Sequence, residues 1–114
     1  MDFGTILKMI AAIGTAAVGM LGLVKPAAVY GLTGLTATGK RGISEIRASF
    51  GGLFIGLGLA PLFLGEPAYQ MLGIGYLALG AARLFAIFYD GTMEKTNLIN
   101  LAIEIVFGLI LVLL

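Results

Sequence analysis

Charged side chains are few in this chain, and several of them lie inside or at the ends of apolar segments. Glu45 and Arg47 directly precede a glycine-rich apolar run, while Arg83 and Glu104 each lie several residues inside another. A charge in a bilayer is costly unless it pairs or faces a wet cavity. We therefore predict a polar site that binds a ligand or a proton. Its candidate residues are Glu45, Arg47, Arg83, Asp90, Asn100 and Glu104.

The segments that position these residues have the length and composition of membrane-spanning helices. The 114 residues are 60% hydrophobic and 11% charged, and the mean hydropathy is +1.08. That composition leaves too little polar surface for a water-soluble protein of this size. A transmembrane helix needs about 20 apolar residues. We predict one all-α domain over residues 1–114, an integral membrane four-helix bundle with spans at about 3–24, 43–64, 68–89 and 97–114.

The composition also excludes several classes of function. The chain contains no cysteine and no histidine, which removes disulfides, thiol chemistry, the common zinc and haem ligand sets and catalytic pairs that contain histidine. The formal charge is +1 and the longest basic run is Lys40-Arg41, so we expect no nucleic-acid partner. We expect no metal and no cofactor. Enzymatic activity is the least favoured class, because no nucleophile and base are visibly paired.

The junctions between the spans carry residues that end helices or favour an interface. Lys25-Pro26 ends the first span, and residues 26–42 are too broken by glycine and threonine to cross a membrane. We expect an interfacial loop or a short surface helix there. Ser44 is the predicted N-cap of the second span. Glu45 then has an alternative, purely structural role, since a carboxylate in the first turn complements the helix dipole.

The first span contains a single cation, Lys8, about two turns from its start. We expect the long stem of Lys8 to snorkel to the nearer interface. The apolar run continues to Val24, which is longer than the core of a usual signal peptide. We therefore expect this segment to be retained as the first span.

Alternating helix directions place most of the candidate residues on one side of the membrane. Arg83 and Glu104 each lie about 10 Å from the short loop that joins their helices, so we predict that they pair, with Glu45 and Arg47 nearby. Asn97, Asn100 and Glu104 share one stripe of the last span. The alternative is a structural ion-pair cluster that only fixes the geometry of the bundle.

Glycines of the second span form a predicted helix-packing face, because small residues let helix backbones approach closely in membranes. The packing residues that we predict are Gly51, Gly52 and Gly56. The first span is also rich in glycine and alanine. These small residues can pack against a helix of a second chain as readily as against a helix of the same chain. We therefore expect a homodimer or a larger homo-oligomer.

Basic residues are unevenly distributed between the two predicted faces of the membrane. The side that carries the polar site also carries Lys25, Lys40, Arg41 and Lys95. The opposite side offers at most Lys8. The positive-inside rule then places the polar loops in the cytoplasm and both termini outside.

At these residues the sequence resembles a family of small bacterial four-helix membrane proteins known as a domain of unknown function. The family has an E-x-R-A-x-aromatic-G-G-L segment, then an R-x6-D-G segment, then a Glu in the last helix. The matching residues are Glu45, Arg47, Ala48, Phe50, Gly51, Gly52, Leu53, Arg83, Asp90, Gly91 and Glu104. The resemblance covers nearly the whole chain. It implies a four-helix fold in the bacterial cytoplasmic membrane and no particular reaction.

The function we favour is the binding of a lipid, an isoprenoid or another amphiphilic small molecule. Its head group would be met by Arg47 and Arg83, because guanidinium groups bind phosphate and carboxylate bidentately. One alternative is a structural or assembly subunit that binds a partner membrane protein through glycine seams. Another is a small proton-coupled exporter of the multidrug type. Those exporters carry their essential Glu in the first helix, where this chain has Lys8 and no carboxylate.

Overall fold

The computed structural model describes residues 2–114, which form helices joined by turns, with no strand among them. Four helical segments are long and apolar enough to cross a membrane. They are α1 (Phe3–Val24), the continuous helix Lys40–Leu64, α5 (Glu66–Asp90) and α6 (Lys95–Leu113). The prediction of an all-helical chain with four spans is confirmed.

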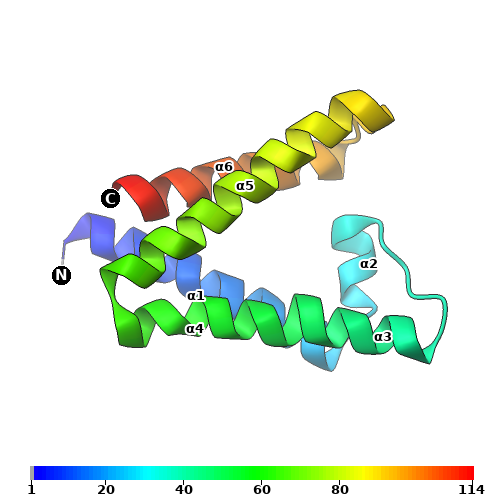
Figure 1. Cartoon of the computed structure of the whole chain (residues 1–114), viewed down its shortest axis with the longest axis horizontal. Coiled ribbons are helices and arrows are strands. Elements are labelled where there is room, and N and C mark those ends of the chain that lie inside the picture. Colours follow the sequence, from blue (N-terminus) through cyan, green and yellow to red (C-terminus); the bar gives the residue numbers. More distant parts are fainter. Residues whose placement is uncertain (1) are drawn as a thin grey trace.

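The four spans are arranged as two pairs of antiparallel helices (Figure 1). One pair is formed by α1 and the second span, and the other by α5 and α6. The pairs meet at the end that holds both termini and diverge toward the other end (Figure 1). The short helix α2 (Ala28–Thr33), which lies in the segment where we expected a surface helix, stands in the opening between them (Figure 1).

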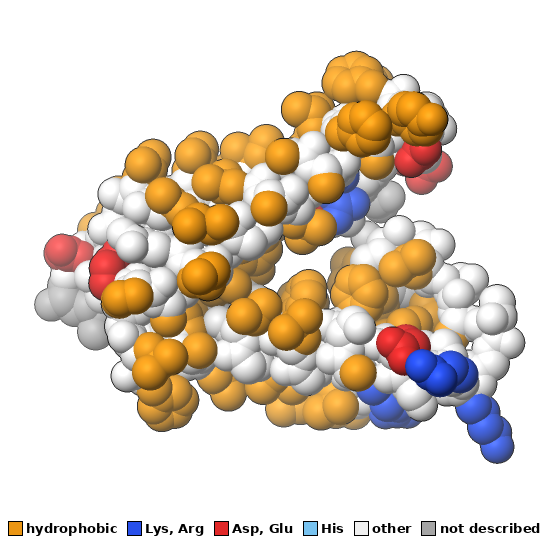
Figure 2. Space-filling view, viewed as in Figure 1, with side chains coloured by type: hydrophobic (Ala, Val, Ile, Leu, Met, Phe, Trp, Pro, Cys, Tyr) orange, Lys and Arg blue, Asp and Glu red, His pale blue; other side chains and the backbone are white. Residues whose placement is uncertain are grey.

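The apolar core lies at the closed end, where the two pairs meet. Its buried residues come from α1, α5 and α6, and they are Ala11, Ala12, Tyr69, Leu72 and Leu111. The outer faces of the helices are covered by hydrophobic side chains (Figure 2). An apolar exterior around a small core is the pattern expected of helices that contact lipid.

The second span is one helix in three parts. It begins as α3 (Lys40–Ile46), passes through the π-helical turn η1 (Arg47–Gly52) and continues as α4 (Leu53–Leu64). The helix starts after Gly39, so Ser44 lies inside it and the prediction of Ser44 as the N-cap is wrong. The reason is that residues between Gly39 and Ser44 already make helical bonds, with the Ile43 N–H donating to the Gly39 carbonyl.

The first span begins at a cap that the sequence analysis did not identify. The Thr5 backbone N–H donates to the Asp2 carboxylate at 2.8 Å, which satisfies an otherwise free donor of the first turn. This backbone hydrogen bond lowers the pKa of Asp2 below its usual value. At the far end, α1 stops at Val24, immediately before Lys25-Pro26, as predicted.

Close backbone contact holds α1 against the second span. A Cβ atom added to Gly58 would lie 2.5 Å from the Ala12 carbonyl oxygen and 2.5 Å from the Ala16 nitrogen. One added to Gly51 would lie 2.9 Å from the Leu23 backbone. Since real Cβ atoms do not approach backbone so closely, these two sites require glycine.

Of the three predicted packing residues, Gly51 packs against another helix of the chain. Gly52 and Gly56 do not, so the prediction is wrong for these two within the chain. A Cβ atom at either of the latter would meet nothing within 4 Å. Spacings of four and of seven residues both return to the same face of a helix. The sequence offers a face through Gly52 and Gly56 and another through Gly51 and Gly58, and the fold uses the second.

This contact predicts a difference between two alanine substitutions in the same helix. Gly58→Ala should destabilise the protein by about 1–3 kcal/mol, because the added methyl group overlaps the α1 backbone. Gly56→Ala is the matched control and should be neutral or slightly stabilising, since its methyl group enters open space. Thermal unfolding of both variants in detergent measures the difference. Equal melting temperatures would contradict the packing assignment.

Candidate functional site

Arg83 of α5 and Glu104 of α6 form a bidentate ion pair between the two helices. The Arg83 Nε donates to Glu104 Oε1 at 2.7 Å, and Nη2 donates to Oε2 at 2.6 Å. The Glu104 residue is only 5% exposed. The predicted pairing is confirmed, and its geometry is that of a strong, charge-assisted contact.

A third hydrogen bond fixes the orientation of the guanidinium group. The Arg83 Nη1 donates to the Asn97 side-chain oxygen at 2.9 Å. Asn97 in turn donates through Nδ2 to the Thr92 carbonyl at 2.9 Å and to the Thr92 hydroxyl at 3.1 Å. Both Asn97 and Thr92 belong to the site, although neither was among the candidates. The polar stripe shared by Asn97 and Glu104 was the available signal.

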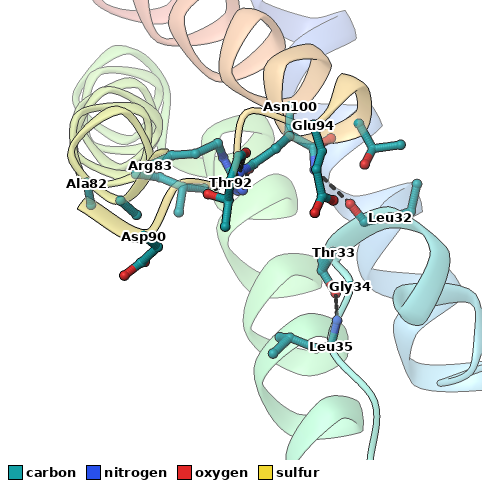
Figure 3. Close-up of a pocket in the computed structure, with 14 residues that line it drawn as sticks. Leu32, Thr33, Gly34, Leu35, Ala82, Arg83, Asp90, Thr92, Glu94 and Asn100 are labelled. Atoms are coloured by element: carbon teal, nitrogen blue, oxygen red, sulfur yellow. Dashed lines mark hydrogen bonds between the residues drawn. The ribbon is translucent and has the colours of Figure 1, made fainter. Parts of the chain in front are cut away.

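Asn100, a candidate residue on the same stripe, connects α6 to the helix in the opening. Its Nδ2 donates to the Leu32 carbonyl oxygen near the end of α2 at 2.7 Å. This bond joins the α5/α6 pair to the segment that stands across from it (Figure 3). Asn100 therefore closes one edge of the opening, and its amide nitrogen donates to α2 and not to the ion pair.

These groups border a polar cavity of about 680 Å³ between α2 and the α5/α6 pair. Figure 3 shows its walls, with Arg83 and Thr92 on one side and the end of α2 across from them. Asp90, another candidate, lines the cavity near its rim. The lining residues are Leu32, Thr33, Gly34, Leu35, Leu79, Ala82, Arg83, Ala86, Asp90, Thr92, Glu94, Thr96, Asn97 and Asn100.

Glu45 and Arg47 do not line this cavity, and the expectation that they lie beside Arg83 is wrong. Glu45 accepts from the Arg41 Nε at 3.1 Å in an exposed pair on α3. Arg47 donates from Nη1 to the Leu23 carbonyl, one of the last carbonyls of α1. The two helix pairs diverge at this end and α2 stands between them (Figure 1), which keeps α3 away from α5 and α6.

Lys8 takes part in a second ion pair, at the closed end of the molecule. Its Nζ lies 2.6 Å from Glu66 Oε2 and 5.4 Å from the centre of the Tyr69 ring. Lys8 is only 4% exposed, so the expectation that it snorkels to the interface is wrong. A carboxylate and an aromatic face from α5 are close enough to stabilise the ammonium where it is.

Between the two ion pairs lies an apolar groove of about 420 Å³ formed mainly by α4 and α5. A hydrogen bond between the Thr15 and Tyr76 hydroxyls lies at its inner wall. Leu79 lines both this groove and the polar cavity. The groove residues are Thr15, Phe54, Leu57, Met71, Leu72, Ile74, Gly75, Tyr76, Ala78 and Leu79.

The hydrogen bonds of the ion pair leave little scope for acid-base chemistry at Glu104. Both oxygens of Glu104 already accept hydrogen bonds from Arg83, so this carboxylate has no oxygen left unpaired for a reacting group. No cluster of acidic residues in the described part of the chain has the arrangement of a metal site. What the site offers is a fixed polar wall next to an apolar groove.

The ion pair predicts strong coupling between two substitutions. Arg83→Ala and Glu104→Ala should each cost about 3–5 kcal/mol, because each strands a partly buried charge. The double variant should cost much less than the sum. Unfolding of the four proteins in detergent measures the coupling. The exposed pair Arg41–Glu45 is the control and should couple by only about 0.3–0.5 kcal/mol. Additive losses at Arg83 and Glu104 would contradict the prediction.

Comparison with known proteins adds a family to this description. No curated protein matches the chain significantly, and no solved structure does. One protein family has a profile that matches residues 4–114, nearly the whole chain. The chain belongs to this family, which is described as a domain of unknown function (DUF4345).

Proposed function

We propose that this protein binds an amphiphilic small molecule, a lipid, an isoprenoid or a compound of similar build. Its polar head group lies in the cavity beside Arg83, and its apolar tail lies in the groove between α4 and α5. The observation that carries this proposal is the position of Leu79, which lines both spaces. A molecule with one polar and one apolar end fits the two together.

The polar half of this site is held in one orientation by hydrogen bonds within the chain. Arg83 is held by Glu104 and by Asn97, and Asn97 is held by Thr92. Groups that are already oriented cost little conformational entropy on binding. The volume of about 680 Å³ also lies in the range of small-molecule sites.

The apolar half of the site supports the choice of an amphiphile over a small polar solute. Phe54 and Leu57 of α4 lie across the groove from Met71 and Ile74 of α5. A tail in this groove would make van der Waals contacts with these apolar side chains. In this proposal the protein is an integral membrane protein of the bacterial cytoplasmic membrane, and the tail enters the groove from the lipid.

A second candidate function is assembly with another membrane helix, from a partner protein or from a second copy. The open face at Gly52 and Gly56 supports it, because glycines four residues apart let a further helix approach. Crosslinking in lipid bilayers separates the two ideas. A monomer that retains an amphiphile favours binding, and a stable oligomer without one favours assembly.

The amphiphile proposal predicts that blocking the junction of cavity and groove removes the ligand. Native mass spectrometry from a mild detergent should show a retained amphiphile on the unmodified chain and its loss in Leu79→Trp. Leu84→Trp is the matched control on the same helix, since Leu84 is 44% and Leu79 is 42% exposed and Leu84 lines neither space. Equal retention by both variants would overturn the proposed binding mode.

We also propose that the open end of the molecule faces the cytoplasm, since Lys25, Lys40 and Arg41 lie there. The chain has no native cysteine, so single cysteines report sidedness directly. In intact cells a membrane-impermeant maleimide should label Leu114→Cys and leave Thr38→Cys unlabelled until the cells are permeabilised. The reverse pattern would invert the orientation.

A further inference from the structure

The apolar groove is lined by a glycine of α5, Gly75, whose position bears on the length of a ligand tail. We propose that Gly75 keeps the groove open for a long hydrocarbon tail, so that the site binds long-chain amphiphiles and Gly75 sets the longest tail that fits. This inference rests on the proposed function and specifies its ligand class. Leu79 determines whether a tail enters the groove at all, and Gly75 determines how far it extends.

Gly75 lies on the path from the polar cavity into the groove. Met71, Gly75 and Leu79 all line the groove, and their four-residue spacing places them on one face of α5. Leu79 also borders the polar cavity. With a rise of about 1.5 Å per residue, Gly75 is about 6 Å and Met71 about 12 Å along the helix axis from Leu79. A tail that enters at Leu79 therefore passes Gly75 before it reaches Met71.

Two other glycines inside α5 are explained by contact with α6. A Cβ atom added to Gly73 would lie 2.7 Å from the Cβ atom of Leu111. One added to Gly80 would lie 3.4 Å from the side chain of Ile105. Both glycines therefore face α6 and let the two helices approach closely.

Gly75 has no such explanation within the chain. A Cβ atom added there would meet nothing within 4 Å, and its φ angle is not positive, so neither packing nor the backbone requires glycine. Glycine also destabilises the interior of a helix relative to alanine. Since Gly75 lines the groove, a side chain at this position would take up groove space. The missing side chain leaves that room for a tail.

The walls around this space suit a hydrocarbon chain. Phe54 and Leu57 of α4 line the groove together with Gly75. The hydroxyls of Thr15 and Tyr76 pair with each other, and the Thr15 hydroxyl also donates to the carbonyl of residue 11 at 2.8 Å. Neither hydroxyl depends on a ligand for a partner. A tail with polar groups would lose its own hydrogen bonds there, and a hydrocarbon tail has none to lose.

The test uses 1-alkylglycerols, neutral amphiphiles that share one head group and differ in tail length. Hexylglycerol and hexadecylglycerol are added separately to the full chain in a mild detergent, and native mass spectrometry measures the bound fraction. Gly75→Leu should bind about tenfold less hexadecylglycerol than the unmodified chain does, because its side chain blocks the groove. Its binding of hexylglycerol should fall by less than about twofold, since a short tail ends near the block. Gly75→Ala should bind about threefold less hexadecylglycerol.

Gly56→Leu is the matched control. Gly56 lies inside α4, a Cβ atom added to it would meet nothing within 4 Å, and it lines neither the groove nor the polar cavity. This variant should bind both probes as the unmodified chain does. Comparing proteins on the same probe cancels the partition of that probe into detergent. Gly75→Leu should unfold at an equal or higher temperature than the unmodified chain, because leucine favours a helix more than glycine does.

The results separate this inference from the function on which it rests. Equal loss of both probes in Gly75→Leu, no loss of hexadecylglycerol, or the same loss in Gly56→Leu would overturn the role of Gly75 and leave amphiphile binding standing. If Gly75→Leu unfolds at a lower temperature, Gly75→Ala decides by the same criteria.

A chain that binds neither probe but retains an amphiphile from the cells is compared on that amphiphile. Its loss from Gly75→Leu and not from Gly56→Leu supports the role of Gly75, and equal retention overturns it. Absence of any bound amphiphile from the unmodified chain would overturn the proposed function itself.

Discussion

A charge inside an apolar helix pair must be paired, and this constraint governs the structure around Arg83 and Glu104. The bidentate contact restrains the rotation and depth of α5 relative to α6. Hydrophobic burial alone does not specify the rotation and depth of a helix in lipid, because lipid tails are as apolar as leucine. The close approach of α5 and α6 at Gly73 and Gly108 specifies them together with the ion pair. With α5 and α6 set, Asn97 and Asn100 are fixed toward the opening. The wall of the polar cavity on the side of α5 and α6 thus depends on the ion pair.

The parts of the fold that follow from one-dimensional patterns could be predicted from the sequence. Apolar run length gave the four spans, and Lys25-Pro26 gave the end of the first. The pairing of Arg83 with Glu104 followed from equal distances to a short loop. Lys8 and Glu66 belong to spans that both begin at the other face, but they differ in depth and no short loop joins their helices, so the same reasoning did not pair them. That pair was also missed because Lys8 was treated as a residue that reaches solvent alone.

The rest depends on contacts between segments that a local pattern does not specify. Two glycine faces of the second span had equally good helical spacing, and only the backbone of α1 distinguishes Gly58 from Gly56. The divergence of the two helix pairs was not visible in the sequence either. This divergence separates Glu45 and Arg47 from Arg83. The prediction that the two residues lie in the same site as Arg83 is therefore wrong, although all three lie toward the same end of the molecule.

The arrangement of two helix pairs joined at one end has a mechanical consequence. The buried core and the Lys8–Glu66 pair hold the closed end, while at the mouth the hydrogen bond from Asn100 to Leu32 links α6 to α2. A single hydrogen bond contributes about 0.5–1.5 kcal/mol. The two helix pairs are therefore held by many contacts at the closed end and by few at the open end. A small rotation at the closed end would move the far ends of the helices by a larger distance, so the width of the opening can change without repacking of the core.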